Sequence, residues 1–276
     1  MRHVRYFSMF SGIGGFELGI EQAARELGIT TECVGYSELD KAAIRTYEEH
    51  FNHDNYGDAT LIEATSVPDH DLLVAGFPCP SFSIAGKQLG FADTRGTLIF
   101  DVIRILEAKQ PRYFILENVK GLVSHDNGQT LRTILRLIDG VGYDIQWKVL
   151  NSKDYGVPQN RERIYLVGNL GGTPRPEVFS ATGSGNPYST VGLTTETAVA
   201  RTLTAGGHSG GNHSGMTVIR TPQGDRRLTP TEWERLQGFP DGWTVGSDTQ
   251  RYKQCGNAVT VNVVRHVAHK LLENAS

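Results

Sequence analysis

A chain of 276 residues with 38% hydrophobic and 21% charged residues is large enough for one sizeable core or for two unequal domains. Its three cysteines, Cys33, Cys79 and Cys255, have no paired spacing, which argues against a disulfide framework or a cysteine-rich zinc site and indicates a reducing compartment. The net charge of -3 excludes a strongly basic protein, and we expect no signal peptide and no membrane span because no apolar run is long enough.

Short apolar segments alternate with helical patterns through the first 170 residues. The expected strands cover residues 4–10, 32–38, 72–77, 112–119, 143–150 and 163–170, and the expected helices cover residues 16–28, 41–51, 97–109 and 129–140. Strands that alternate with helices of this length are typical of parallel sheets with helices on both faces. We therefore predict an α/β fold with a doubly wound, mostly parallel sheet.

The composition changes after residue 170. Residues 171–225 are rich in Gly, Thr, Ser and Pro, which is typical of a linker or a disordered segment. Apolar residues nevertheless recur there at the spacing of short strands, namely Val191, Leu193, Leu203, Val218 and Ile219. We interpret this region as part of a small, loop-rich second domain.

Two helical patterns end the chain. The first has Thr229 as a suitable N-cap and Pro230 in its first turn. The second, over residues 257–272, is amphipathic and is expected to return to the large domain. The predicted domains are therefore residues 1–170 together with 252–276, and residues 171–251.

Charge is distributed unevenly along the chain. Residues 1–150 hold 14 Lys and Arg against 20 Asp and Glu, whereas residues 151–276 hold 13 against 10. From Arg161 to Arg227 every Lys or Arg position is an arginine, whose planar guanidinium matches phosphates and guanine edges. The second half can therefore accept a polyanion, although charge alone does not require one.

A glycine-rich turn follows the first expected strand. The sequence FSGIGGFELG, residues 10–19, lets the backbone turn tightly and lets a ligand approach closely. It lacks the full GxGxxG pattern of dinucleotide sites, so a nucleoside without phosphates suits it as well. Glu38 ends the second strand, where an acidic residue binds ribose hydroxyls in such sheets, and Asp58 precedes the third strand. A plain turn with two solvated carboxylates is the alternative interpretation.

Reactive side chains follow other strands of the predicted sheet. Cys79 lies in GFPCPSFS, just past the third strand, and the prolines on both sides fix φ and remove amide donors. Glu117 stands at the end of an apolar strand, where a carboxylate is costly unless it is used or paired. Arg161 and Arg163 are two residues apart and share one face of an extended segment. Taken alone, Cys79 could be a small buried cysteine, and the two arginines could belong to an ordinary edge strand. Together, these side chains indicate a reactive edge of the sheet.

Taken in order, these motifs resemble those of the DNA (cytosine-5)-methyltransferases. The resemblance rests on FSGIGGFELG, GFPCPSFS, LENV, QNRER and QCGNAVTVNVV, and it extends from Phe10 to Val264. It implies the fold of the class I S-adenosylmethionine-dependent methyltransferases with a small target-recognition domain. It also implies transfer of a methyl group from S-adenosylmethionine to C5 of a cytosine in a short duplex DNA target.

The resemblance assigns the reactive residues. In the family a cysteine thiolate adds to cytosine C6, which makes C5 able to attack the methyl group, and the thiolate leaves after C5 has lost its proton. By resemblance Cys79 is this nucleophile, which is covalent catalysis. Glu117 would hold or protonate cytosine N3 and hold the amino group, Arg163 would hold O2, and Arg161 would position Glu117 and the loop backbone. The sequence names no acceptor for the C5 proton.

The resemblance also implies a site for S-adenosylmethionine and no metal. Phe10, Gly12 and Gly14 would lie under the methionine, Glu38 on the ribose, and Asp58 on the adenine amino group. The other residues expected to bind the cofactor are Pro78, Leu98, Asn257 and Val259.

A base inside a duplex cannot reach the edge of a sheet, so the target cytosine is expected to be flipped out. The segment after Cys79 resembles the mobile loop of the family, in which Ser81 and Ser83 would contact DNA. Thr202 and Leu203 match the Thr-Leu pair of the target-recognition region. The sequence departs from the family at residue 80, where proline replaces the usual glutamine, and in a short recognition region, which favours a short target or weak specificity.

Three other functions are compatible with parts of the sequence. A tRNA cytosine-5 methyltransferase shares the catalytic motifs, but the glycine-rich loops and the Thr-Leu pair look like those of the DNA enzymes. A DNA- or cofactor-binding module without activity fits the fold, but the catalytic side chains are all present. A small-molecule methyltransferase or a dehydrogenase would use the glycine turn and leave Cys79, Glu117 and the paired arginines without a role.

The resemblance finally implies a setting for the protein. We expect a cytoplasmic modification enzyme of a prokaryotic or phage-infected cell that acts as a monomer on double-stranded DNA. Any cognate restriction endonuclease would be a separate protein that is not physically bound.

Overall fold

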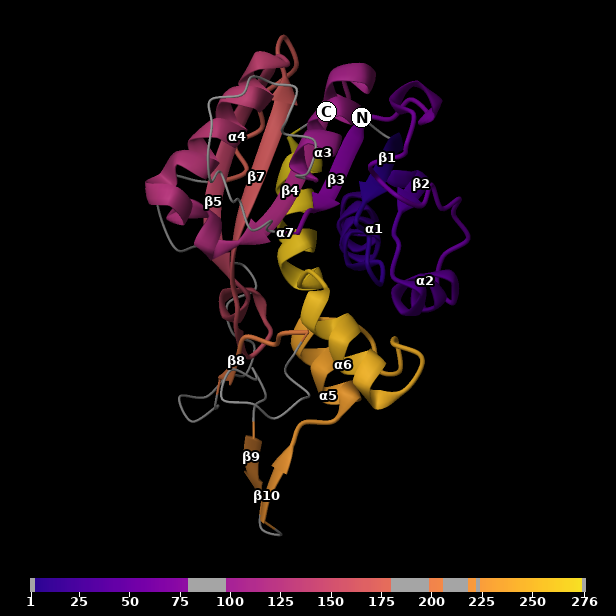
Figure 1. Cartoon of the computed structure of the whole chain (residues 1–276), viewed down its shortest axis with the longest axis vertical. Coiled ribbons are helices and arrows are strands. Elements are labelled where there is room, and N and C mark those ends of the chain that lie inside the picture. Colours follow the sequence, from indigo (N-terminus) through magenta and orange to yellow (C-terminus); the bar gives the residue numbers. More distant parts are fainter. Residues whose placement is uncertain (1–2, 79–97, 180–198, 206–217, 222–223, 275–276) are drawn as a thin grey trace.

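The computed structural model describes residues 3–78, 98–179, 199–205, 218–221 and 224–274 (Figure 1). Six strands form the central sheet, in the order β2-β1-β3-β4-β7-β5. Their bounds are β1 His3–Met9, β2 Thr30–Ser37, β3 Leu72–Gly76, β4 Tyr113–Val119, β5 Tyr143–Asn151 and β7 Glu162–Leu170. The pairs β1–β2, β1–β3 and β3–β4 are parallel, which confirms the predicted sheet. Because β1 lies between β2 and β3, the strand order switches direction there, and ligands bind at such a point in open α/β sheets.

Strand β7 runs against its neighbours β4 and β5, which the alternation of strands and helices did not predict. Only the 3-10 turn η4 (Ser152–Tyr155) and the two-residue strand β6 (Gln159–Asn160) lie between β5 and β7. A parallel neighbour needs a crossover of about a dozen residues or more, usually with a helix. The short connection therefore sends β7 back alongside β5.

Helices cover both faces of the sheet, as predicted. On one face lie α1 (Gly15–Leu27) and α7 (Val261–Glu273), and on the other lie α3 (Ile99–Lys109) and α4 (Gln129–Gly140) (Figure 1). Alternate residues of each strand serve the two cores, because successive side chains of a strand point to opposite faces. In β1, for example, Tyr6 packs toward α1 and α7, whereas Phe7 packs toward α3 and α4.

The smaller elements lie in the loops between the strands and in the lower part of the molecule. Helix α2 (Lys41–Glu48) follows β2, and the 3-10 turns η1 (Ala64–Ser66), η2 (Lys120–Val123) and η3 (His125–Gly128) lie in loops. The lower part of the molecule in Figure 1 contains β8 (Ala200–Arg201), the hairpin of β9 (Val218–Thr221) and β10 (Gly224–Arg227), α5 (Pro230–Gln237) and α6 (Asp248–Asn257). The short strands expected at residues 191 and 193 lie outside the described residues. No helix among the described ranges is both long and apolar enough to span a bilayer.

The prediction of one terminal helix over residues 257–272 is wrong in its first turn. Helix α6 ends at Asn257 and α7 begins at Val261, so residues 257–272 do not form one helix. Ala258 and Thr260 between them have extended backbones, with ψ of 151° and 115°. The carbonyl of Ala258 accepts a hydrogen bond from Arg161 at 2.8 Å, a tertiary contact that the helical pattern of the sequence does not reveal.

The predicted start of α5 is confirmed. The hydroxyl of Thr229 accepts a hydrogen bond from the amide of Glu232, and the Glu232 carboxylate accepts one from the amide of Thr229. Pro230 occupies the first turn, where its missing N–H costs nothing.

Candidate active site

The turn after β1 depends on left-handed backbone conformations. Phe10 and Gly12 have φ of 55° and 58°, and Gly14 has φ of 84° as the N-cap of α1. A side chain at Gly14 would also collide with Phe51, whereas among the described residues nothing lies within 4 Å of a Cβ at Gly12. Gly12 is therefore needed for its conformation, and Gly14 for its conformation and for space.

Glu38 receives hydrogen bonds from three backbone amides. The amide of Gly12 donates to Oε2 at 2.9 Å, and the amides of Leu39 and Asp40 donate to Oε1 at 2.8 Å each. The amide of Gly12 is thus already bound to a carboxylate and is not free for a phosphate. The turn therefore favours a nucleoside without phosphates, whose ribose hydroxyls can donate to the remaining lone pairs of Glu38.

Asp58 lies in a tight turn near Glu38. Its Oδ1 accepts hydrogen bonds from the amide of Thr60 at 2.9 Å and from the Thr60 hydroxyl at 2.8 Å. Asn55 joins this turn to β2, because its Oδ1 accepts from the amides of Glu38 at 3.3 Å and Gly57 at 2.9 Å. The two predicted acidic residues are therefore brought to the same edge of the sheet.

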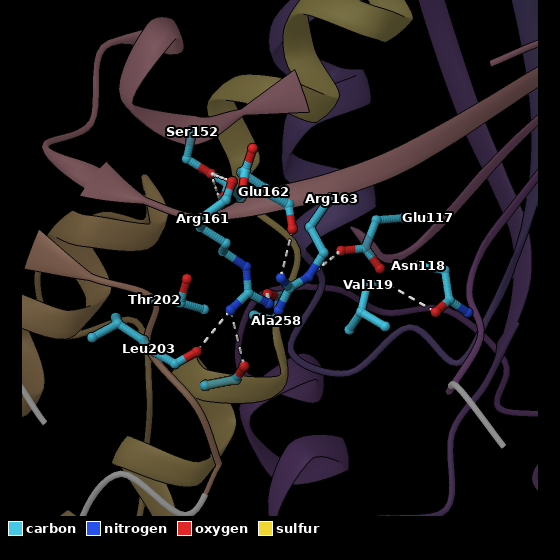
Figure 2. A network of polar contacts seen from close by, with 12 residues as sticks. Glu117, Asn118, Val119, Ser152, Arg161, Glu162, Arg163, Thr202, Leu203 and Ala258 are labelled. Carbon is cyan, nitrogen blue, oxygen red and sulfur yellow. Dashed lines mark hydrogen bonds and ion pairs between the residues drawn. The ribbon is translucent and has the colours of Figure 1, made fainter. Parts of the chain in front are cut away.

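Glu117 and Arg163 form a buried ion pair at the carboxyl end of β4 (Figure 2). Glu117 is 7% exposed, and Nε of Arg163 lies 3.1 Å from its Oε1. That N–H is not aligned for a hydrogen bond, so this buried oxygen has no hydrogen-bond donor among the described residues. Burial raises the pKa of Glu117, an effect that Arg163 and Arg161 oppose. Such a carboxyl group holds its proton more readily than an exposed one.

Arg161 binds main-chain carbonyl groups from two distant segments (Figure 2). Its Nη1 donates to Leu203 at 2.8 Å and to Gly256 at 3.3 Å, and its Nη2 donates to Ala258 at 2.8 Å. The side chain is buried, which lowers the pKa of the guanidinium, with Arg163 as the next cause. Arg161 therefore fastens the start of β7 to residues 200–205 and to the junction of α6 and α7.

A cavity of about 390 Å³ connects these groups. Its walls come from the glycine turn, the end of β2, the carboxyl ends of β3 and β4, the two arginines and helix α6. Of the predicted site residues, the lining includes Phe10, Gly12, Glu38, Pro78, Glu117, Arg161, Arg163 and Asn257. A larger hollow of about 490 Å³ lies against Ile145 and Trp147 of β5, away from this set.

Four predicted cofactor residues lie outside the lining. Gly14 caps α1, Asp58 lies in its turn, and Leu98 is the N-cap of α3. Val259 packs against the glycine turn, where a Cβ on Gly15 would lie 2.7 Å from its Cγ2.

Three predicted residues, Cys79, Ser81 and Ser83, lie outside the described residues. Pro78, the last described residue before Cys79, is exposed and lines the cavity. Asn118 fixes the preceding residue, because its Nδ2 donates to the carbonyl of Phe77 at 2.8 Å. Phe77 and Pro78, which lead from β3 to Cys79, therefore line the same cavity as Glu117.

Thr202 and Leu203 lie beside Arg161. The Thr202 hydroxyl donates to the carbonyl of Asn160 at 2.6 Å, and the amide of Leu203 donates to Oε1 of Gln159 at 3.0 Å. The Leu203 side chain is fully buried with Trp233 and Cys255. This pair is thus built into the support of the site, and its contact with DNA stays a prediction.

The sequence analysis did not identify an ion pair at the rim of the cavity. Nζ of Lys253 on α6 lies 2.6 Å from Oδ2 of Asp40, the N-cap of α2, and both residues line the cavity. Lys253 stands four residues before Asn257, on the same face of α6, and this spacing could have pointed to it.

The cavity fits S-adenosylmethionine by the chemistry of its walls. A carboxylate stands ready for the ribose, the glycine turn leaves open space at Gly12, and the amide of Gly12 is already bound to that carboxylate. Among the residues that the structure describes, no group of three His, Cys, Asp or Glu could hold a metal ion.

Comparisons with known proteins agree with this geometry. Residues 4–182 and 177–273 match the family described as C-5 cytosine-specific DNA methylase. The chain is 40% identical to the type II methyltransferase M.NlaX of Neisseria lactamica, over 97% of this chain and 96% of that protein. It is 37% identical to the type II methyltransferase M.HpaII of Haemophilus parainfluenzae, over 97% and 89%.

Solved structures share the fold. The Dnmt2 methyltransferase of S. pombe superposes with a TM-score of 0.77 at 19% identity, covering 98% of each chain. The Entamoeba histolytica methyltransferase EhMeth superposes with a TM-score of 0.76 at 17% identity, covering 100% of each chain.

Proposed function

The chain belongs to the C-5 cytosine-specific DNA methylase family, and from this premise we propose how its residues carry out the reaction. It is an enzyme that methylates C5 of cytosine in DNA, as the description of its family states, and the relatives that it matches over nearly their whole length are named type II methyltransferases. The tRNA, small-molecule and inactive alternatives are not favoured, because its curated relatives are type II methyltransferases.

The cofactor lies between the glycine turn and α6 in this proposal. S-adenosylmethionine, when bound, supplies the methyl group. Glu38 accepts hydrogen bonds from its ribose and Asp58 accepts one from its adenine amino group. The remaining residues of the site are Phe10, Gly12, Gly14, Pro78, Leu98, Asn257 and Val259.

Cys79 is the nucleophile that adds to cytosine C6. Support comes from the chemistry of the other two cysteines of the chain. Burial raises the pKa of Cys33 to about 12, and burial also raises that of the fully buried Cys255. A thiolate is the reactive form of cysteine, so neither buried thiol suits the reaction. Cys79 directly follows Pro78, which lines the cavity. Gly76, the residue paired with Glu117 between β3 and β4, precedes it closely in the sequence.

The buried pair of Glu117 and Arg163 is the observation that carries the proposal. A Glu117 with a raised pKa can give a proton or a hydrogen bond to cytosine N3, and the carboxyl group can accept one from the amino group. Arg163 beside it then holds the O2 atom. These contacts stabilise the charge that develops on the ring as the cysteine adds.

DNA lies across the lower part of the molecule in this proposal. Residues 1–170 with 252–276 form the catalytic domain, and residues 171–251 form the target-recognition domain, with Ser81, Ser83, Thr202 and Leu203 on the DNA side. Helix α6, which contains residue 252, packs on α5, so α6 lies in space with the smaller domain. We propose a cytoplasmic monomer that acts on double-stranded DNA and needs no bound endonuclease.

Duplex DNA that carries 5-fluorocytosine tests the nucleophile. Fluorine at C5 cannot leave as a proton, so the enzyme should stay covalently attached after the methyl group is transferred. Wild type and C33A should give a complex that survives denaturant in gel electrophoresis, and C79A should give none. Sequencing of the trapped DNA would then define the target.

The C33A protein is the matched control, because it removes a cysteine that lies away from the cavity. A complex with C79A would show that another residue is the nucleophile. No complex with wild type on DNA of varied sequence, but one with tRNA, would move the substrate from DNA to RNA.

A further inference from the structure

The turn that carries Asp58 closes on itself. The amide of Leu61 donates to the carbonyl of Asp58 at 2.9 Å, and Oδ1 of Asp58 accepts from the amide and the hydroxyl of Thr60. Among the described residues no hydrogen bond falls on Oδ2, the oxygen that remains for a ligand. The direction of this carboxylate therefore depends on what holds the turn in place.

The sheet holds the beginning of the turn. The hydroxyl of Ser37 donates to the carbonyl of Gly57 at 2.7 Å, and Oδ1 of Asn55 accepts from the amide of Gly57 at 2.9 Å. These contacts fix the residue before Asp58 to the end of β2, next to Glu38. They do not reach residues 59–62.

Helix α3 holds the other end through Arg104. Its Nη2 donates to the carbonyl of Ala59 at 2.9 Å, and its Nη1 donates to the carbonyl of Ile62 at 2.5 Å. Asp101, one turn earlier on α3, lies 3.1 Å from the same guanidinium and orients it. Two carbonyls from the two ends of one turn match the planar fork of arginine, which a lysine ammonium cannot reproduce.

Hydrophobic packing alone would keep this segment near α3. Ala59 and Ile62 are 3% and 6% exposed and belong to the same core as Val102 and Ile103 of α3. Such packing is not directional, so it does not set the rotation of the turn. The guanidinium adds what packing lacks, because two hydrogen bonds fix two points of the turn backbone.

We propose that Arg104 is a positioning residue for adenine recognition. By holding the carbonyls of Ala59 and Ile62, it sets the direction in which Oδ2 of Asp58 meets the adenine amino group. The inference rests on the role proposed above for Asp58. Arg104 is not among the residues that line the cavity, so it acts through the turn.

The test compares the binding of S-adenosylhomocysteine and S-inosylhomocysteine, in which an oxygen replaces the adenine amino group. Calorimetric titration of the full chain without DNA measures both affinities. The Asp58 carboxylate accepts a hydrogen bond from the amino group and repels the oxygen, so wild type should prefer the adenine compound by about tenfold or more. R104Q should reduce the preference to less than about threefold, and R104K should fall between the two.

R136Q is the matched control, because Arg136 is an exposed arginine of α4. It should keep the wild-type preference. A role of Arg104 in stability alone would lower the thermal midpoint of R104Q and leave the ratio of the two affinities unchanged. That result overturns the inference.

D58N separates this inference from the proposed function. Its amide can donate to the oxygen of the inosine compound, so the preference should vanish or reverse. A wild-type preference in D58N would show that the role proposed for Asp58 is wrong. If D58N loses the preference and R104Q keeps it, the role proposed for Asp58 stands and the positioning role of Arg104 is wrong. If R104Q does not fold, R104K and D101N decide, and a wild-type preference in both overturns the inference.

Discussion

Glu117 combines a costly position with a partner that makes the position tolerable. Its carboxyl group is buried, and Arg163 lies at 3.1 Å to offset part of that cost. The sequence places this residue well, because a carboxylate at the end of the apolar strand FILENV has few uses other than pairing or chemistry. The direction of the pKa shift needed the structure, since it depends on the balance between burial and two arginines.

Replacement of Glu117 by glutamine tests its part in catalysis. E117Q keeps the shape and loses the proton and the charge, so kcat for DNA methylation should fall by about a hundredfold or more. The affinity for S-adenosylhomocysteine should stay as in wild type. Activity that requires the protonated carboxyl is present below its raised pKa and is lost as the pH rises through it, so E117Q should also remove that limb of the pH profile.

E162Q is the control for this change. Glu162 lies between Arg161 and Arg163 in the QNRER motif, but its carboxylate is partly exposed and pairs with Lys120 at the surface. Its kcat should stay within about twofold of wild type, as expected for an exposed ion pair. A wild-type kcat in E117Q would show that Glu117 has no part in the reaction.

Glu17 is a second buried carboxyl group, and the sequence pattern did not reveal it. Phe16, Leu18 and Ile20 are among the apolar residues that recur at helical spacing in α1, yet Glu17 is fully buried and Leu18 is only partly buried. The reason is tertiary, because α2 folds over this face and the hydroxyl of Tyr47 donates to Oε1 of Glu17 at 3.2 Å. Periodicity in one helix cannot show a second covering element.

The buried Glu17 should make the stability of the protein depend on pH. Burial raises its pKa from 4.5 to about 7. The folded state therefore binds the proton more tightly than the unfolded state, so the stability gained from protonation is complete below about 4.5 and is lost as the pH rises to about 7. Relative to wild type, E17Q should gain up to about 3 kcal/mol in unfolding free energy between pH 5 and pH 8. Urea unfolding at both pH values measures this difference.

The exposed residue Glu107 of α3 provides the control. E107Q should show the same change between the two pH values as wild type. If E17Q also follows wild type, the pH dependence comes from another group.

At the scale of elements, the end of α6 packs directly against the backbone of residues 204 and 205. A Cβ on Gly256 would lie 2.7 Å from the carbonyl oxygen of Thr204 and 2.5 Å from the amide nitrogen of Ala205. Arg161 binds the carbonyls of Leu203 and Gly256 on the two sides of this contact. The glycine in the QCGNAV motif is therefore needed for the close approach of two segments, which the sequence alone did not show.

Replacement of Gly256 by alanine should separate these segments. Because backbone atoms cannot give way as side chains can, G256A should lose about 1–3 kcal/mol of unfolding free energy. Its affinity for duplex DNA should fall by more than its affinity for S-adenosylhomocysteine, since residues 200–205 belong to the proposed DNA-binding part. Denaturant unfolding and fluorescence anisotropy with labelled DNA measure the two effects.

G140A is the matched control for this prediction. Gly140 ends α4, and no atom of the part of the chain that the structure describes would lie within 4 Å of a Cβ there. G140A should keep the DNA affinity and the stability of wild type or gain slightly in stability. Equal losses in both variants would mean that the contact at Gly256 has no special part.

At the scale of the whole molecule, the two ends of the chain build one core. Val4 near the start and Leu271 and Leu272 near the end pack in the same cluster, and α1 lies along α7 (Figure 1). The amphipathic pattern of the last segment predicted this return to the large domain. The reversed β7 and the break between α6 and α7 were not predictable in the same way, because they follow from connection length and from the contacts of Arg161.

A circularly permuted chain tests whether the catalytic domain is built from both ends of the chain. The natural ends would be joined by a flexible glycine-serine linker, and new ends would be opened between the exposed residues Pro174 and Arg175. The catalytic elements then follow one another without interruption, so the permuted chain should unfold cooperatively and bind S-adenosylhomocysteine within about threefold of wild type. A chain shortened to residues 1–174 lacks α7 and leaves six apolar residues of that helix missing from the core over one face of the sheet, Val263, Val264, Val267, Ala268, Leu271 and Leu272. It should show no sharp transition in calorimetry, because burial of that face supplies much of the core. A shortened chain that folds and binds cofactor as wild type does would show that α7 is dispensable, and the catalytic domain would then consist of the first part of the chain alone.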